Sequence, residues 1–143
     1  MKSGQAPARQ FATMRLPRDP TVIAPDGSDV RVLLGLPAGG MAHFELAAGQ
    51  TAQAVTHRTV EEIWYVVAGS GEIWRKLGAM EEIVALEPGV CVTIPLGTWF
   101  QFRASITSRV AVVAVTLPPW PGEGEAKVVT GPWRPSAQLK GPA

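Results

Sequence analysis

Short apolar segments, separated by glycine and proline turns, run through most of this chain. Each segment is rich in β-branched and aromatic residues, and nowhere do apolar residues recur with the period of an amphipathic helix. This pattern predicts an all-β protein. The expected strands are 30–36, 41–46, 62–67, 72–77, 82–86, 90–94, 99–103 and 109–116.

The number and spacing of these segments predict one small domain. About eight to ten short strands in a chain of this size are typical of a sandwich or a barrel of the jelly-roll type. The chain has 143 residues, enough for a single core, and 46% of them are hydrophobic. The sequence Gly69-Ser70-Gly71 predicts a hairpin turn between the strands 62–67 and 72–77.

The two ends of the chain differ from the middle. Residues 1–20 are polar and punctuated by prolines, so we expect an N-terminal arm, followed by a barrel domain at 21–117. The segment 118–143 contains six prolines together with Trp120 and Trp133. Prolines exclude central strands here. This C-terminal tail either packs on the barrel through its tryptophans or crosses to a partner subunit.

Composition excludes several classes of function. The formal net charge is +1 and the basic residues are scattered, which argues against nucleic-acid binding. No apolar run approaches the ~20 residues of a membrane span, and no signal peptide is visible. The single cysteine, Cys91, lies in an apolar segment and is expected to be buried and inert. We therefore expect a cytoplasmic protein with no membrane contact.

Two sets of residues have a distinctive spacing. In the first, Gly49 is followed after five residues by Val55; His57 comes two positions later, Glu62 follows four residues beyond, and Gly69 six residues beyond that. The second set begins at Gly89. It continues with Pro95 after five residues, Gly97 after one, Phe100 after two and Ala104 after three.

In order and spacing, these two sets resemble the two characteristic motifs of the cupins, and the resemblance covers about residues 30–116. It implies a cupin-type jelly-roll β-barrel in a single domain. In metal-binding cupins, two histidines and a glutamate of the first motif and a histidine of the second hold one metal inside the barrel. By this resemblance His57 and Glu62 keep two of the four positions, whereas Val55 and Phe100 replace the other two.

The replacement residues weaken the case for a metal. Valine and phenylalanine have no lone pair to offer, and protein sites for Zn, Fe or Mn normally supply three or four side chains. We expect either no cofactor or a weakly bound divalent metal (Zn, Fe, Mn or Ni) on His57 and Glu62. If His43 faced the barrel interior, it could complete a set of two histidines and one carboxylate.

Without a metal, His57 and Glu62 remain candidates for a catalytic or ligand-holding pair. A carboxylate beside an imidazole stabilises the protonated imidazole, so we expect the pKa of His57 to be raised. Such a pair can donate to an oxyanion or transfer a proton. Val55, Trp64, Phe100 and Phe102 would line the space around it, which suits a small, partly apolar ligand with a polar group. A buried pair with only a structural role is the alternative.

Three classes of function therefore stay open. The first is a metal-free protein that binds a small molecule inside the barrel. The second is a small enzyme, such as an isomerase, epimerase, lyase or dioxygenase, that uses His57 and Glu62 with or without a metal. The third is a structural or interaction domain with a filled barrel. We also expect a homodimer, because exposed aromatic strands are usually covered by pairing.

Overall fold

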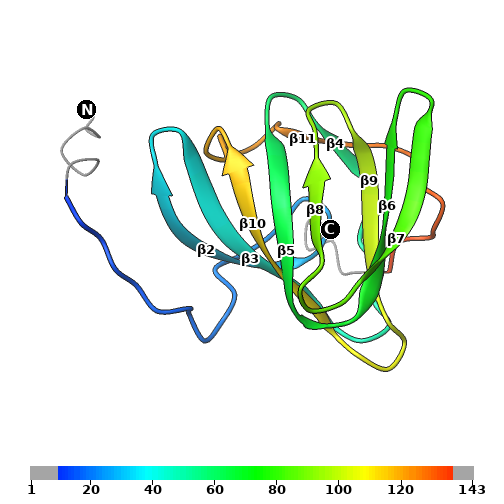
Figure 1. Ribbon diagram of the computed structural model, residues 1–143, viewed down its shortest axis with the longest axis horizontal. Coiled ribbons are helices and arrows are strands. Elements are labelled where there is room, and N and C mark those ends of the chain that lie inside the picture. The colour runs from blue at the N-terminus through cyan, green and yellow to red at the C-terminus, as the bar shows by residue number, and fades with distance from the viewer. Residues whose placement is uncertain (1–9, 137–143) are drawn as a thin grey trace.

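The computed structural model describes residues 10–136, and in this range it is an all-β protein with two antiparallel sheets packed face to face (Figure 1). One sheet has six strands, in the order β1 (Val22–Ile23), β2 (Asp29–Leu36), β3 (Gly39–Leu46), β10 (Val110–Leu117), β5 (Glu61–Gly69) and β8 (Cys91–Ile94). The other has five, in the order β11 (Ala126–Val128), β4 (Val55–His57), β9 (Trp99–Ala104), β6 (Gly71–Leu77) and β7 (Met80–Leu86).

These strands confirm the all-β, jelly-roll prediction. Every segment predicted as a strand forms one. The short strands β1, β4 and β11 were not predicted, because two or three residues are too few to show an alternating pattern. Among residues 10–136, the structure contains no helix with the length and apolar character needed to cross a membrane.

The core lies between the two sheets and follows from alternation along the strands. In β5, every second residue from Glu62 to Val66 is buried and the residues between them are exposed. In β9, Phe100 and Phe102 point to the same side. Inward-facing residues from both sheets form one continuous hydrophobic cluster, which includes Leu46, Trp64, Ile73 and Phe102. The interior is therefore built from motif residues as well as ordinary core residues.

The hairpin predicted between β5 and β6 is wrong. β5 pairs with β10 and β8, whereas β6 pairs with β7 and β9 in the other sheet. The sequence Gly69-Ser70-Gly71 carries the chain from one sheet to the other. A Cβ atom at Gly71 would lie 2.1 Å from the Arg103 carbonyl oxygen, so glycine here allows the two backbones to approach.

The tail adds β11 to the edge of the five-stranded sheet, and its last described part, coloured red in Figure 1, packs on the outer face of that sheet. The Gln101 side chain donates to the Trp133 carbonyl oxygen and accepts from the Trp133 amide. The guanidinium of Arg103 lies over the Trp133 ring, 3.9 Å from its centre. Further out, Ser136 and Thr51 exchange two hydrogen bonds. Residues 137–143 lie outside the described range.

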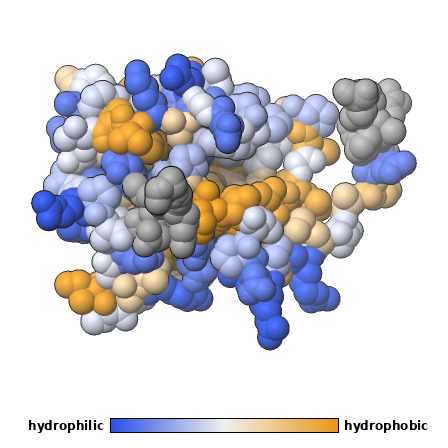
Figure 2. Space-filling view, turned by 180° about the vertical axis from the view of Figure 1, so that it is seen from behind, coloured by the Kyte–Doolittle hydropathy of each residue, from blue (hydrophilic) through white to orange (hydrophobic). Residues whose placement is uncertain are grey.

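The N-terminal arm is described from residue 10 onward, so residues 1–9 of the predicted arm lie outside the described range. The Arg31 side chain donates hydrogen bonds to the carbonyl oxygens of Pro17 and Arg18. Hydrophobic residues also reach the surface. Seen from behind, they gather in a band that extends from the middle of the molecule towards the side that carries β2 (Figure 2).

The close approach at Gly71 can be tested by adding one methyl group. We expect Gly71→Ala to lower the free energy of unfolding by about 1–3 kcal/mol, because the new methyl group would overlap the Arg103 backbone. Gly40→Ala is the matched control, since its Cβ would meet only ordinary contacts. Urea unfolding curves measure both changes. Equal stability of the two variants would contradict this account.

Candidate functional site

His57 reaches the barrel interior because β4 alternates. Val55 and His57 are buried and Thr56, between them, is more accessible. β4 pairs with β9 so that Val55 lies opposite Phe100, which puts the two residues that replace metal ligands side by side. The His57 ring meets Phe100 edge-on, with 5.2 Å between the ring centres. Hydrocarbon therefore occupies the two positions that the motif resemblance assigns to metal ligands.

Glu62 enters the same space from the opposite sheet. Its Oε2 atom lies 3.7 Å from Nδ1 of His57, slightly beyond hydrogen-bond distance. Its other oxygen, Oε1, accepts a hydrogen bond of 2.6 Å from the indole nitrogen of Trp64. The Nδ1 atom of His57 is buried and has no hydrogen-bond partner among residues 10–136. The structure thus brings His57, Glu62 and Trp64 together and leaves one polar atom unsatisfied.

Burial determines the charge states of this pair. It lowers the pKa of His57 to about 4, against a smaller opposing effect of the Glu125 charge. It raises the pKa of Glu62 to about 7; the Trp64 hydrogen bond opposes the shift and the nearby charge of Asp26 adds to it. The expectation that the carboxylate would raise the His57 pKa is wrong, because loss of hydration outweighs attraction to a carboxyl group whose own pKa is raised by burial.

Aromatic rings close the space around the pair. Trp64 makes edge-on contacts with Phe100 and Phe102, with ring centres 5.9 and 4.9 Å apart. Trp120, from the tail, also packs edge-on against His57, with 4.9 Å between the two ring centres. Trp120 is 37% exposed. Trp120 therefore covers the imidazole of His57, and Trp120 itself reaches the protein surface.

Glu125 fixes the segment that carries Trp120. Its carboxylate accepts hydrogen bonds from the amide and hydroxyl of Thr59 and from the amide of Val60. Burial opposes ionisation of Glu125, but these hydrogen bonds outweigh it and lower its pKa. The amide of Arg58 also donates to the Glu125 carbonyl oxygen. The tail is thus anchored at the turn that joins β4 to β5, directly after His57.

The residues present do not fit a tightly held metal. Val55 and Phe100 offer no donor atom, and among the described residues no three histidine, cysteine or acidic side chains gather in a group that could hold a metal ion. The set that included His43 does not form. His43 alternates with Phe44, whose ring packs against Trp64, so it faces the other side of its sheet, where it interacts with Arg31.

Sequence reasoning missed several residues of the site. Trp64 was expected only to line the site with apolar surface, yet its indole nitrogen donates a hydrogen bond to Glu62. The sequence indicated that the two residues share a strand face, but it did not indicate this hydrogen bond. Asp26 is followed by Gly27, a sequence that indicates only a turn, and Glu125 and Trp120 lie in a tail with no periodic pattern. Cys91 is exposed rather than buried, because its side of β8 is uncovered.

The raised Glu62 pKa predicts a pH-dependent stability. The folded protein holds this proton more tightly than the unfolded chain, so Glu62 favours folding at acid pH, and this contribution is lost as pH rises from about 4.5 to about 7. Glu62→Gln replaces the ionisable carboxyl group with a neutral amide and therefore removes this loss of stability. We expect the stability of Glu62→Gln relative to the unmodified protein to increase as pH rises through this window, and then to level off.

Urea unfolding across a pH series measures this difference. The lowered His57 pKa acts in the opposite direction, reducing stability as pH falls from 6.5 to about 4, but it is present in both proteins and cancels in the comparison. Glu87→Gln, at an exposed turn, is the control and should show little dependence on pH. A Glu62→Gln difference that is constant across the window would contradict the raised pKa.

The fold is similar to that of solved proteins of several kinds. KdgF from Halomonas sp. is 18% identical over 77% of this chain and 97% of its own, with a TM-score of 0.63. A Streptomyces PAC13 variant with uridine is 17% identical over 83% of this chain and 92% of its own, with a TM-score of 0.62. Lactobacillus farciminis oxalate decarboxylase in its formate complex is 14% identical over 73% of this chain and 32% of its own, with a TM-score of 0.63. No curated protein matches the sequence.

The family model described as "Cupin domain" matches residues 42–116, slightly more than half of the chain. The matched range contains His57, Glu62, Val55 and Phe100, and it ends at the last residues of β10. The two spaced motifs, the jelly-roll sheets and this match agree, and the chain belongs to the cupin family.

Proposed function

We propose that this protein binds a small, partly apolar molecule inside the barrel without needing a metal, and that His57 and Glu62 hold the ligand's polar group. The observation that carries the proposal is the unsatisfied Nδ1 atom of His57, buried 3.7 Å from Glu62. A buried polar atom without a partner costs free energy, and a ligand that supplies the missing hydrogen bond recovers it.

The surroundings of the pair support an uncharged ligand group. At neutral pH His57 is neutral, since its pKa is about 4, so its Nδ1 atom can accept a hydrogen bond from a ligand hydroxyl or amide. Glu62, with a pKa of about 7, is present in both protonation states. Trp64, Phe100 and Phe102 offer apolar and aromatic surface for the rest of the molecule.

Catalysis is the second candidate. A carboxyl group with a pKa near 7, facing a neutral imidazole, is suited to accept and return a proton at physiological pH. Because proton transfer needs no metal, this arrangement favours an isomerase, epimerase or lyase over a dioxygenase. The two candidates separate in one variant: Glu62→Gln should abolish an activity but only weaken simple binding.

Ligand binding can be tested through the tryptophans. Uridine is the first probe, because a structural neighbour contains it, followed by a panel of small neutral metabolites. We expect a saturable change in tryptophan fluorescence, weakened about tenfold by Glu62→Gln and unaffected by the exposed control Glu87→Gln. Metal analysis of protein purified without chelators accompanies it. A stoichiometric metal would contradict metal-free binding, and so would a panel without any binder.

We also propose that the protein forms a homodimer through the outer face of the six-stranded sheet. On this face Tyr65 lies opposite Val113, and in the next row Ile63 lies opposite Val115, which lies opposite Met41. Tyr65 is 50% exposed. The charged groups beside these residues, Arg31, Glu45 and Arg109, are already paired with one another. The face thus offers little to a charged partner, whereas a second copy presents matching apolar surface.

The dimer proposal predicts the effect of one charge. Light scattering after gel filtration should give twice the mass of the chain for the unmodified protein and the mass of one chain for Tyr65→Glu. Val128→Glu, at an exposed position on β11 in the other sheet, should remain dimeric. A monomeric unmodified protein at micromolar concentration, or a dimeric Tyr65→Glu variant, would contradict this interface.

A further inference from the structure

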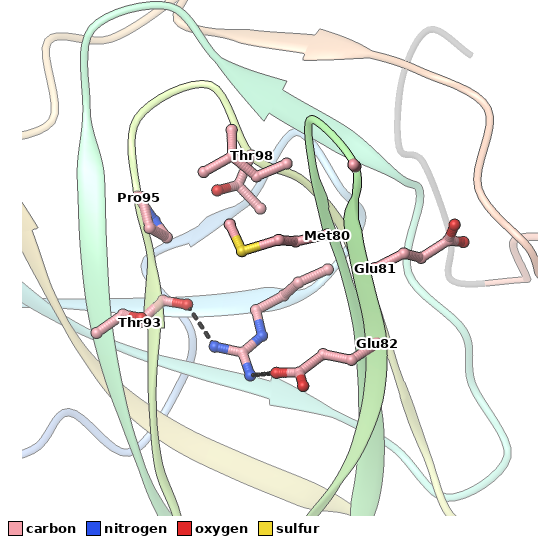
Figure 3. Close-up of a pocket in the computed structure, with 9 residues that line it drawn as sticks. Met80, Glu81, Glu82, Thr93, Pro95 and Thr98 are labelled. Carbon is pink, nitrogen blue, oxygen red and sulfur yellow. Dashed lines mark hydrogen bonds and ion pairs between the residues drawn. The ribbon is translucent and has the colours of Figure 1, made fainter.

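An open groove lies between the β6–β7 hairpin and the turn that joins β8 to β9 (Figure 3). Its volume is about 530 Å³, within the range of small-molecule sites. The hairpin contributes Arg75, Leu77 and Met80, and the other wall contains Pro95 and Thr98. Sequence reasoning assigned no function to this region.

Two buried polar atoms at the groove have no hydrogen-bond partner within the part of the chain that the structure describes. One is Oγ1 of Thr98, in a residue that is 2% exposed. The other is Nε of Arg75, whose terminal nitrogens are already occupied: one donates to the Thr93 carbonyl oxygen at 2.7 Å and the other to Glu82 at 2.6 Å. Because Arg75 is held on both sides, its Nε–H direction is fixed and its hydrogen bond remains unmade.

The Met80 side chain lies at the groove between these two groups. In Figure 3 its side chain is seen between Thr98 and the guanidinium that bridges Thr93 and Glu82. As a residue Met80 is 67% exposed, and an unbranched thioether changes rotamer easily. A molecule that displaces it gains contact with both unsatisfied atoms and with the apolar surface of Leu77 and Pro95.

The charges of the groove select the ligand. Arg75 carries one positive charge, whereas Glu81 and Glu82 carry two negative ones, so the formal sum is −1 and an anion is disfavoured. The Nε–H group of Arg75 needs a hydrogen-bond acceptor. The hydroxyl of Thr98 can donate to the same acceptor atom of a ligand. A carbonyl oxygen on an uncharged molecule meets these requirements.

We infer that this groove binds an uncharged molecule with a carbonyl group, whose oxygen accepts hydrogen bonds from Arg75 Nε and Thr98 Oγ1 after Met80 moves aside. The inference rests on the proposed function in one respect, namely the link to the interior. Thr56 on β4 lies opposite Trp99 on β9. Because the two strands are antiparallel, one further step along this register brings His57 opposite Thr98. A ligand in the groove is therefore next to the wall of the His57–Glu62 site.

The experiment compares two probes of the same shape and different charge, benzamide and benzoate. The ¹⁵N-labelled full chain is titrated near pH 7, and the side-chain Nε–H signal of Arg75 is followed. We expect benzamide to shift this signal saturably within about 10 mM, and benzoate to bind at least about threefold more weakly. Equal affinity for both probes, or no saturation with either, would overturn the inference.

Variants test the two contacts and the cover separately. Thr98→Val removes only the hydroxyl and keeps the side-chain shape, so it should weaken benzamide binding about threefold to tenfold without harming the fold. Arg75→Lys keeps the charge and removes Nε–H, with a similar expected loss; because the Arg75 signal is then absent, binding to this variant is followed through the backbone amide signal of Thr98. Met80→Ala should bind at least as tightly as the unmodified protein. Arg109→Lys, an exposed matched control on the other sheet, should change nothing. Unchanged affinity in Thr98→Val would overturn the inference.

The same titration distinguishes this inference from the proposed function. If the Arg75 signal saturates equally in the unmodified protein and in Glu62→Gln, and the Trp64 indole signal does not move, the groove site is supported and the proposed role of Glu62 fails. If the Trp64 signal moves while the Arg75 signal does not, the ligand enters the barrel by another route, the proposed function stands and the groove inference fails.

Discussion

The contacts of one buried side chain, Trp64, hold the two sheets and the site together. Its ring packs edge-on against Phe44 on β3 and against Phe100 and Phe102 on β9, so it touches both layers of the barrel. Its indole nitrogen simultaneously donates to Glu62. The residue that fills the core therefore also orients the carboxyl group, and the geometry of the site cannot change without disturbing the packing between the sheets.

The electrostatics of the site follow from this packing. Replacement of two ligand positions by Val55 and Phe100 excludes water from His57 and Glu62, and exclusion of water shifts both pKa values towards the neutral forms. An ion pair would have needed a closer approach or additional hydrogen bonds to offset the lost hydration. At neutral pH His57 is therefore neutral and Glu62 only partly ionised, which changes what the pair can recognise.

The resemblance of the two spaced motifs to those of the cupins was sufficient to predict the fold. The faces on which His57 and Glu62 lie depend on local pattern, since alternation in a strand assigns each side chain to a face. The crossing at Gly69–Gly71 was mistaken for a hairpin, because a glycine turn joins strands within a sheet or between sheets equally well. The contacts of Trp120 and Glu125 depend on where a long, aperiodic tail folds back, which no local pattern encodes.

The anchoring of the tail by Glu125 means that the site and the family domain have different boundaries. The cupin match ends at residue 116, yet one wall beside the imidazole is supplied by Trp120, and the turn after His57 relies on a carboxylate nine residues beyond that end. Members of the family that share the barrel but differ after their last strand would enclose the same two motif positions differently. Divergence in this short terminal strip offers a route to new chemistry that leaves the barrel core untouched.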